Sequence, residues 1–102
     1  MKPPKTEIPE KTQKKLLKLR IAIDQADHDL LKAFEKRNKA VKKVGELKRL
    51  HDLPIVQPER WKEVVENRVK KAKKLKIHEP FLREVLELIH QESVRLQQRG
   101  KK

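Results

Sequence analysis

Three cationic side chains, Arg20, Arg37 and Lys48, lie on or beside an apolar seam of one expected helix, where Leu or Ile would be usual. Arg37 and Lys48 project from nearly one helix face, with backbones roughly 16 Å apart, so together they could hold a small dianion. Because an unpaired buried charge is costly, each cation needs a partner. For any single cation the simpler alternative is an ion pair with an acid such as Asp24, Asp27 or Glu46. Three such cations in one seam favour an anion site.

Arg20 is too distant to join the other two cations within one chain. It lies about 40 Å from Lys48 along the same helix. Both side chains can reach one ligand only if Arg20 comes from a second copy of the chain.

Other chemistries find little support in the residue types. There is no Cys, and the only glycines are Gly45 and Gly100, so neither a thiol nucleophile nor a Gly-rich phosphate loop is available. The four histidines show no metal-ligand spacing, and we expect them to be surface or interface residues: His28, His51, His78 and His90. No cofactor or metal is expected. An anion site of this kind suits a reaction that needs only positioning and charge stabilisation.

Composition limits the architecture. With 102 residues, 35% hydrophobic and 42% charged, the chain is one domain at most and would be thinly cored as a monomer. Long helices in so small a chain therefore indicate self-association. No apolar run approaches the length of a membrane span and no signal segment begins the chain, so we expect a cytoplasmic protein.

The net charge of +13 leaves the partner open. It fits solvated helix faces, but also nucleic acid, a membrane surface or a small anion. Aromatic residues make up only 3%, which argues against a protein that stacks single-stranded bases.

The hydrophobic pattern predicts an all-α fold with one long helix and two shorter ones. Residues 1–12 are interpreted as a mobile basic tail containing prolines, and Thr12 as the N-cap of a helix that runs to about Leu50. Its seam repeats every seven residues, as in a coiled coil, and predicts that the helix packs against a partner chain. Two series form this seam: Leu16, Ile23, Leu30, Arg37 and Val44, with Leu19, Ala26, Ala33, Ala40 and Leu47 beside them.

Two prolines break the chain after the long helix. Pro54 and Pro58 end it and begin a second helix to about Leu75, with Gln57 as a weak N-cap. A third helix is expected from Pro80 to about Gln98, which gives a domain over residues 13–98 and a disordered basic tail over 99–102. The apolar stripe of the second helix contains Trp61, Val64, Val65, Val69 and Ala72. That of the third helix contains Leu82, Val85, Leu86, Ile89 and Leu96, and Ser93 lies in the same stripe.

Several motifs, in order and at matching spacing, resemble the all-helical class of chorismate mutases over about residues 16–98. They are Leu19-Arg20-x-x-Ile23-Asp24-x-x-Asp27-x-x-Leu30-Leu31, Arg37 followed by Val44-Gly45-x-x-Lys48, Leu53-Pro54-Ile55 through Pro58-Glu59-Arg60, and Ile89-His90-Gln91-Glu92-Ser93-x-x-x-Gln97. No single motif would suffice. The Gln-Pro-Glu-Arg-Trp run is similar to that of some bacterial members.

The resemblance implies an intertwined helical homodimer, an enzyme that converts chorismate to prephenate in the shikimate pathway, towards Phe and Tyr, without a cofactor. Arg37, Lys48 and Arg60 would bind the substrate within one chain, and Arg20 would reach in from the other protomer. Lys48 and Gln97 would bracket the ether oxygen, and Ser93 would assist near a carboxylate. Association with another shikimate-pathway enzyme is possible under this resemblance, whereas binding to nucleic acid or membrane is not expected.

Two positions depart from the family pattern. Trp61 stands where the family usually has a Glu that bonds the substrate's ring hydroxyl, and Gln57 stands where an Asp is common. Trp61 is either a lineage variant of the substrate site or a packing residue. Isochorismate-pyruvate lyases share the fold and lack that Glu, which makes them the alternative enzyme. A basic helical nucleic-acid-binding protein is the alternative of another class.

Overall fold

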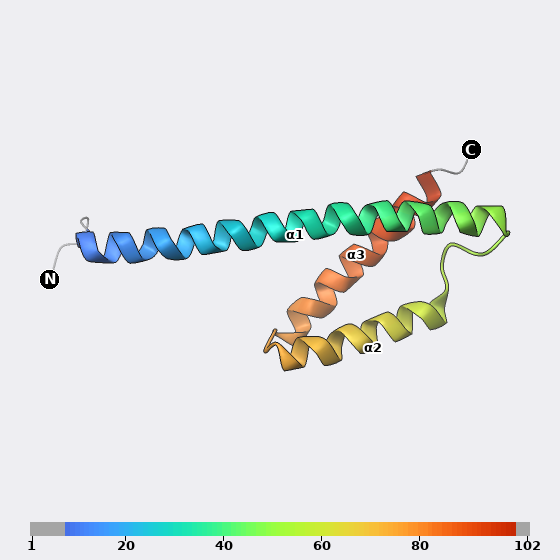
Figure 1. Cartoon of the computed structure of the whole chain (residues 1–102). Coiled ribbons are helices and arrows are strands. Elements are labelled where there is room, and N and C mark those ends of the chain that lie inside the picture. The colour runs from blue at the N-terminus through green and yellow to red at the C-terminus, as the bar shows by residue number, and fades with distance from the viewer. Residues whose placement is uncertain (1–7, 100–102) are drawn as a thin grey trace, which may run out of the picture. The chain divides into compact units, whose positions relative to one another are not determined.

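The computed structural model describes residues 8–99, which form three helices and no strand. They are α1 over Glu10–Leu50, α2 over Pro58–Lys74 and α3 over Glu79–Arg99 (Figure 1). The predicted all-α class, with one long helix and two shorter ones, is confirmed. Two compact units make up the chain, Met1–Lys36 and Arg37–Lys102. Residues 1–7 and 100–102 of the two expected tails lie outside the described residues, while residues 10–12 belong to α1 and Arg99 to α3. The domain division itself stays a prediction.

The first unit contains the N-terminal part of α1. The helix begins at Glu10, so the expected N-cap at Thr12 is wrong. The carbonyl of Pro9 already accepts a hydrogen bond from the Gln13 amide at 2.9 Å, which closes the first turn three residues earlier. The acidic side chain of Glu10 also suits the positive end of the helix dipole.

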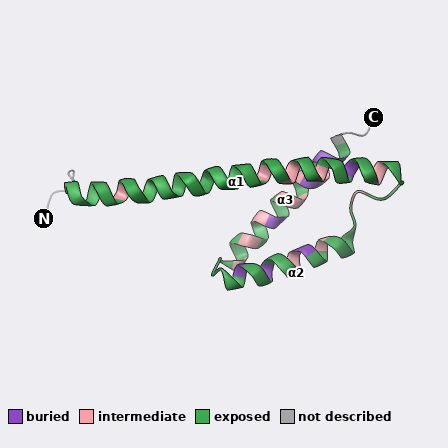
Figure 2. Cartoon of the chain, viewed as in Figure 1, coloured by how far each residue is buried: buried purple, intermediate pink, exposed green. Residues whose placement is uncertain are grey.

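Large apolar side chains of this unit are exposed, as Figure 2 shows by the green of α1 there. Leu19 is 62% exposed, Ile23 58% and Leu30 53%, and all three belong to the seam. Within the described residues, these seam positions are therefore not buried.

The second unit combines the C-terminal part of α1 with α2 and α3. Its small core is formed by residues of the two shorter helices (Figure 2), and consists of Val64, Val69, Ala72, Leu86 and Leu96. All five belong to the two stripes predicted from the sequence. Ser93 and Gln97, at 7% exposure each, are buried beside them on α3.

Both α1 and α2 end in a left-handed residue that is not glycine. Asp52 has φ 53° and Lys76 has φ 60°. At these ends the amide of Leu53 donates to the Lys48 carbonyl at 2.7 Å, and that of Ile77 to the Ala72 carbonyl at 2.9 Å. These bonds satisfy carbonyls that the last turn would otherwise leave free, as in a Schellman motif. They turn the chain sharply enough to bring α3 back towards α1.

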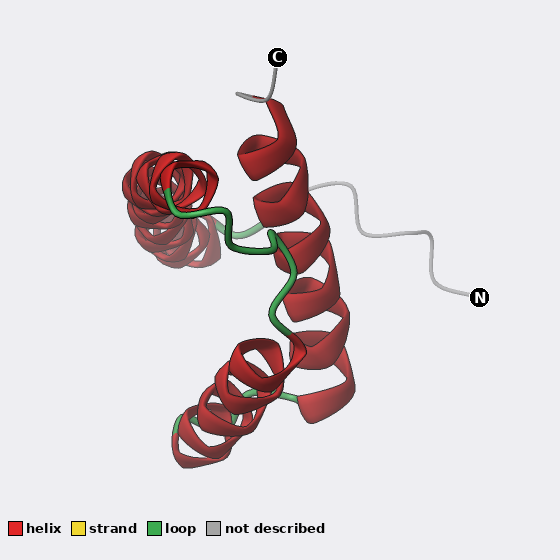
Figure 3. Cartoon of the chain, turned by 90° about the vertical axis from the view of Figure 1, so that its right-hand side faces the viewer, coloured by secondary structure: helices red, strands yellow, loops and turns green. Residues whose placement is uncertain are grey.

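The C-terminal half of α3 crosses the part of α1 that follows Arg37 (Figures 1 and 3). Gly45 is the only buried residue of α1 and lies at this crossing. A Cβ atom placed on Gly45 would come within 3.0 Å of the Gln97 Cα atom. Beside it, Arg49 donates to the Gln97 carbonyl at 2.8 Å. The missing side chain of Gly45 therefore sets how closely Gln97 approaches α1.

Within residues 8–99, no helix combines the length and apolarity that crossing a membrane requires.

Candidate active site

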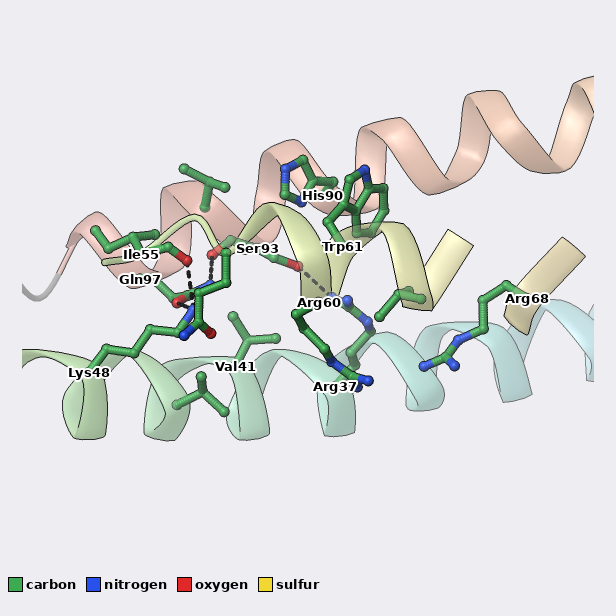
Figure 4. A pocket seen from close by; sticks show the side chains of 14 residues that line it. Arg37, Val41, Lys48, Ile55, Arg60, Trp61, Arg68, His90, Ser93 and Gln97 are labelled. Carbon is green, nitrogen blue, oxygen red and sulfur yellow. Dashed lines mark hydrogen bonds between the residues drawn. The ribbon is translucent and has the colours of Figure 1, made fainter. Parts of the chain in front are cut away.

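One pocket of the second unit gathers polar and charged side chains from all three helices (Figure 4). Its polar and aromatic lining consists of Arg37, Lys48, Gln57, Arg60, Trp61, Arg68, His90, Ser93 and Gln97. Its aliphatic lining consists of Val41, Val44, Ile55, Val64 and Val94. The lining thus contains four cations and no carboxylate, which is the charge balance of an anion site.

Lys48 and Gln97 form the first pair across the pocket, between α1 and α3. The Lys48 ammonium donates to Gln97 Oε1 at 2.7 Å and to the Ile55 carbonyl at 2.6 Å (Figure 4). The Gln97 amide nitrogen donates to the Ser93 carbonyl at 3.2 Å. An ammonium has three N–H groups and an amide nitrogen has two, so one proton on each remains for a ligand.

Arg37 and Ser93 form the second pair, one turn of α3 before the first. Arg37 Nη1 donates to Ser93 Oγ at 2.6 Å, and that hydroxyl donates to the Ile89 carbonyl at 2.8 Å. The hydroxyl proton of Ser93 is thereby used within α3, so Ser93 acts on Arg37 as an acceptor that fixes its direction. Four of the five guanidinium N–H groups stay available to an anion.

Trp61 and His90 form the third pair, between α2 and α3. Their rings stack with centroids 4.1 Å apart and an interplanar angle of 19°. Both rings line the pocket (Figure 4) and both side chains are half-buried. His90, which the sequence predicts to be a surface or interface residue, is half-buried and lines this pocket against Trp61.

Arg60, Arg68 and Gln57 complete the polar lining from α2 and its N-cap position. Gln57 makes no side-chain cap bond to α2, which agrees with its weak capping character. Arg60 pairs with Glu63 at 2.6 Å, with both side chains largely exposed. Because exposed ion pairs contribute only about 0–1 kcal/mol, this pair can open for a dianionic ligand at little cost. Arg68 Nη1 contacts Asn67 Oδ1 at 3.1 Å.

The electrostatics of the pocket favour an incoming anion. Burial lowers the pKa of the Arg37 guanidinium, and the nearby charge of Arg68 lowers it further. Burial likewise lowers the pKa of the Lys48 ammonium. Among the described residues, the polar partners of these two cations are neutral, so the alternative of ion pairs with Asp24, Asp27 or Glu46 is not realised for them. A negatively charged ligand would relieve the repulsion between Arg37 and Arg68.

Residues 19–98 match the sequence model of the chorismate mutase type II family. The chain belongs to this family. A relative named 4-amino-4-deoxychorismate mutase, from Streptomyces pristinaespiralis, is 38% identical over 79 residues, which are 78% of this chain and 61% of the relative. The T-protein of Haemophilus influenzae is 37% identical over 75 residues, 74% of this chain and 20% of that protein.

A third relative is the bifunctional chorismate mutase/prephenate dehydratase of Aquifex aeolicus, 41% identical over 51 residues, half of this chain and 14% of that protein. The chain therefore spans 61% of the Streptomyces mutase and about a fifth or less of the two longer relatives. The family membership identifies the all-helical fold.

Of the site residues expected from the sequence, all but Arg20 line this pocket: Arg37, Lys48, Gln57, Arg60, Trp61, Ser93 and Gln97. Arg20 is exposed on α1 within the first unit. Sequence analysis missed Arg68 and His90 as lining residues. Their spacing carried a usable signal, because Arg68 lies two turns after Trp61 on α2 and His90 one turn before Ser93 on α3.

Proposed function

We propose that the chain is a chorismate mutase, which rearranges chorismate to prephenate towards Phe and Tyr. The observation that supports this most is the pair of hydrogen-bonded contacts, Lys48 to Gln97 and Arg37 to Ser93, in a pocket whose lining has no carboxylate. Arg37 and Lys48 are held by acceptors one turn apart on α3, so both cations can donate to one small anionic substrate.

The rearrangement is unimolecular: the ether C–O bond breaks while a C–C bond forms, and no external group gains or loses a proton. Catalysis therefore depends on holding a compact substrate conformer and stabilising charge on the ether oxygen. Under this proposal, the remaining N–H groups of Lys48 and Gln97 donate to that oxygen. Arg37, directed by Ser93, holds a carboxylate, and Arg60 leaves Glu63 to bind the substrate as well.

Arg20 takes part in this proposal only from a second protomer. The seam positions Leu19, Ile23 and Leu30 are exposed in the first unit, which supports burial against a partner helix. We therefore propose an obligate homodimer in which the partner's Arg20 completes each site. Sedimentation should show a dimer at assay concentrations, and a folded, active monomer would contradict this part. Docking onto another shikimate-pathway enzyme and a cytoplasmic location stay predictions.

The decisive assay follows the loss of chorismate absorbance and the appearance of prephenate. Arg37→Ala should lower kcat/KM by about 10²-fold or more, since it removes a bidentate charged contact and leaves Ser93 without its donor. Arg83→Ala is the matched control, because Arg83 is also a helical arginine bonded to a neighbour, Glu79, but lies outside this pocket. Its activity should equal that of the unsubstituted chain. Absence of prephenate above the uncatalysed rate would refute the proposal.

Two further measurements, with isochorismate as substrate and with duplex DNA as ligand, test the alternatives. A lyase would release pyruvate and salicylate from isochorismate. A nucleic-acid binder would bind duplex DNA with a steep salt dependence that survives Arg37→Ala.

A further inference from the structure

The three side-chain pairs of the pocket follow one face of α3 in order. Gln97 faces Lys48, Ser93 faces Arg37, and His90 stacks on Trp61. Residues 90, 93 and 97 are spaced by one helical turn each, so their pairs lie about 5–6 Å apart along the pocket. The pocket thus changes along its length from two cationic pairs to one aromatic pair.

The cationic pairs orient an anionic ligand. Carboxylates and the ether oxygen gain most where Lys48 and Arg37 donate, which leaves the remaining, non-anionic part of the ring for the aromatic pair. Val64 and Val94 also line the pocket. Stacked rings and aliphatic side chains favour an uncharged, unsaturated ring.

The aromatic pair brings no negative charge to that part of the ligand. Neither Trp61 nor His90 can be an anion, and no carboxylate lines the pocket elsewhere, while Arg60 and Arg68 line it from the same helix as Trp61. A ligand ring that carries an ammonium group would meet like charges without a counter-ion. Like charges placed together in a binding site reduce affinity and exclude ligands.

We propose that the stacked pair of Trp61 and His90 is a specificity-determining wall, which accepts a substrate ring bearing a neutral hydroxyl and rejects a ring bearing an ammonium. The proposal rests on the proposed mutase function. It means that this chain prefers chorismate to 4-amino-4-deoxychorismate, in which an aliphatic amine, protonated near pH 7, replaces one hydroxyl. Trp61 is then a residue of the substrate site and not only a packing residue.

The test compares kcat/KM for the two compounds in the unsubstituted chain and in two variants, Trp61→Gln and Trp61→Glu. The variants have nearly the same shape and both remove the stack, so the difference between them isolates one negative charge. We expect the unsubstituted chain to favour chorismate by at least about tenfold. The ratio of kcat/KM for chorismate to kcat/KM for the amino compound should be about tenfold lower in Trp61→Glu than in Trp61→Gln.

Lys62→Gln and Lys62→Glu form the matched control pair. Lys62 is the exposed neighbour of Trp61 and does not line this pocket, so the same one-charge difference there should leave the ratio unchanged. Circular dichroism checks that each variant is folded. If the substitutions at Trp61 prevent folding, His90→Gln and His90→Glu place the same charge difference on the other ring of the wall.

The outcomes separate this inference from the mutase proposal. If the chain turns over neither chorismate nor the amino compound, the proposed function itself is refuted. Turnover of chorismate with a ratio that is equal in the Gln and Glu variants, or a preference of the unsubstituted chain for the amino compound, overturns the role of the wall. A ratio that moves as much at Lys62 as at Trp61 also overturns it, because the effect would then be one of overall charge.

Discussion

Replacing Gly45 with Ala tests whether the crossing of α1 and α3 positions the Gln97 amide for the proposed reaction. The added Cβ atom would lie 3.0 Å from the Gln97 Cα atom, 3.1 Å from Cγ and 3.2 Å from Cβ. Ordinary carbon contacts are about 3.5–4.0 Å. Since the closest atom belongs to the α3 backbone, a rotation of the Gln97 side chain cannot relieve the contact, and α3 itself must move by a few tenths of an ångström.

Two opposing terms determine the stability of Gly45→Ala. Alanine in a helix interior is favoured over glycine by about 1 kcal/mol. Inserting a methyl group into a close contact costs about 1–3 kcal/mol. The free energy of unfolding should therefore fall by roughly 0–2 kcal/mol, and the variant should remain folded.

Activity should suffer more than stability. The Lys48 to Gln97 bond of 2.7 Å and the Arg49 bond to the Gln97 carbonyl of 2.8 Å both cross the contact that must widen. Because a displacement of about 1 Å can cost about 10²-fold in rate, a shift of a few tenths should lower kcat about tenfold, with a smaller change in KM.

Urea denaturation and chorismate turnover measure the two quantities. Lys43→Ala is the control, because it also places alanine on α1 but at an exposed position outside the pocket, and its kcat should not change. A Gly45→Ala enzyme with full kcat would refute the reasoning that this approach positions Gln97.

Three further predictions concern individual donors. Burial lowers the pKa of Lys48, and deprotonation removes the positive charge that makes its ammonium a strong donor. The value of kcat/KM should therefore decline at alkaline pH as that ammonium deprotonates. Lys48→Arg should abolish the alkaline decline, and an unchanged profile would contradict this. The Gln97 amide donates without taking up a proton, so the activity of the native chain should not require acid pH. Gln97→Glu should gain activity as pH falls, because a carboxylate facing Lys48 stays ionised at neutral pH and cannot donate. Arg68→Ala should raise KM for chorismate about tenfold with little change in kcat, and an unchanged KM would exclude Arg68 from ligand binding.

Local features explain why so much of the fold could be predicted. The seam of α1 and the stripes of α2 and α3 are periodicities of the sequence itself, and Pro54 and Pro58 exclude a continuous helix wherever the chain folds. The positions of the helix ends were harder to predict from the sequence. Asp52 and Lys76 turn the chain in a left-handed conformation without the glycine that usually signals it, and Pro9 closes the first turn before Thr12.

The sequence by itself determined which cations could act together. The spacing of Arg37 and Lys48 follows from helix geometry alone, as does the separation of Arg20 from them. The motif resemblance added Ser93 and Gln97 before any contact was known.

Only the tertiary structure decided what these side chains do to one another. The close approach at Gly45 places Gln97 against Lys48, and one turn earlier Ser93 against Arg37. The turn after α2 stacks Trp61 on His90. Such contacts join residues far apart in the chain, and they depend on how closely and at what angle the helices cross, which side-chain packing sets and no local pattern encodes.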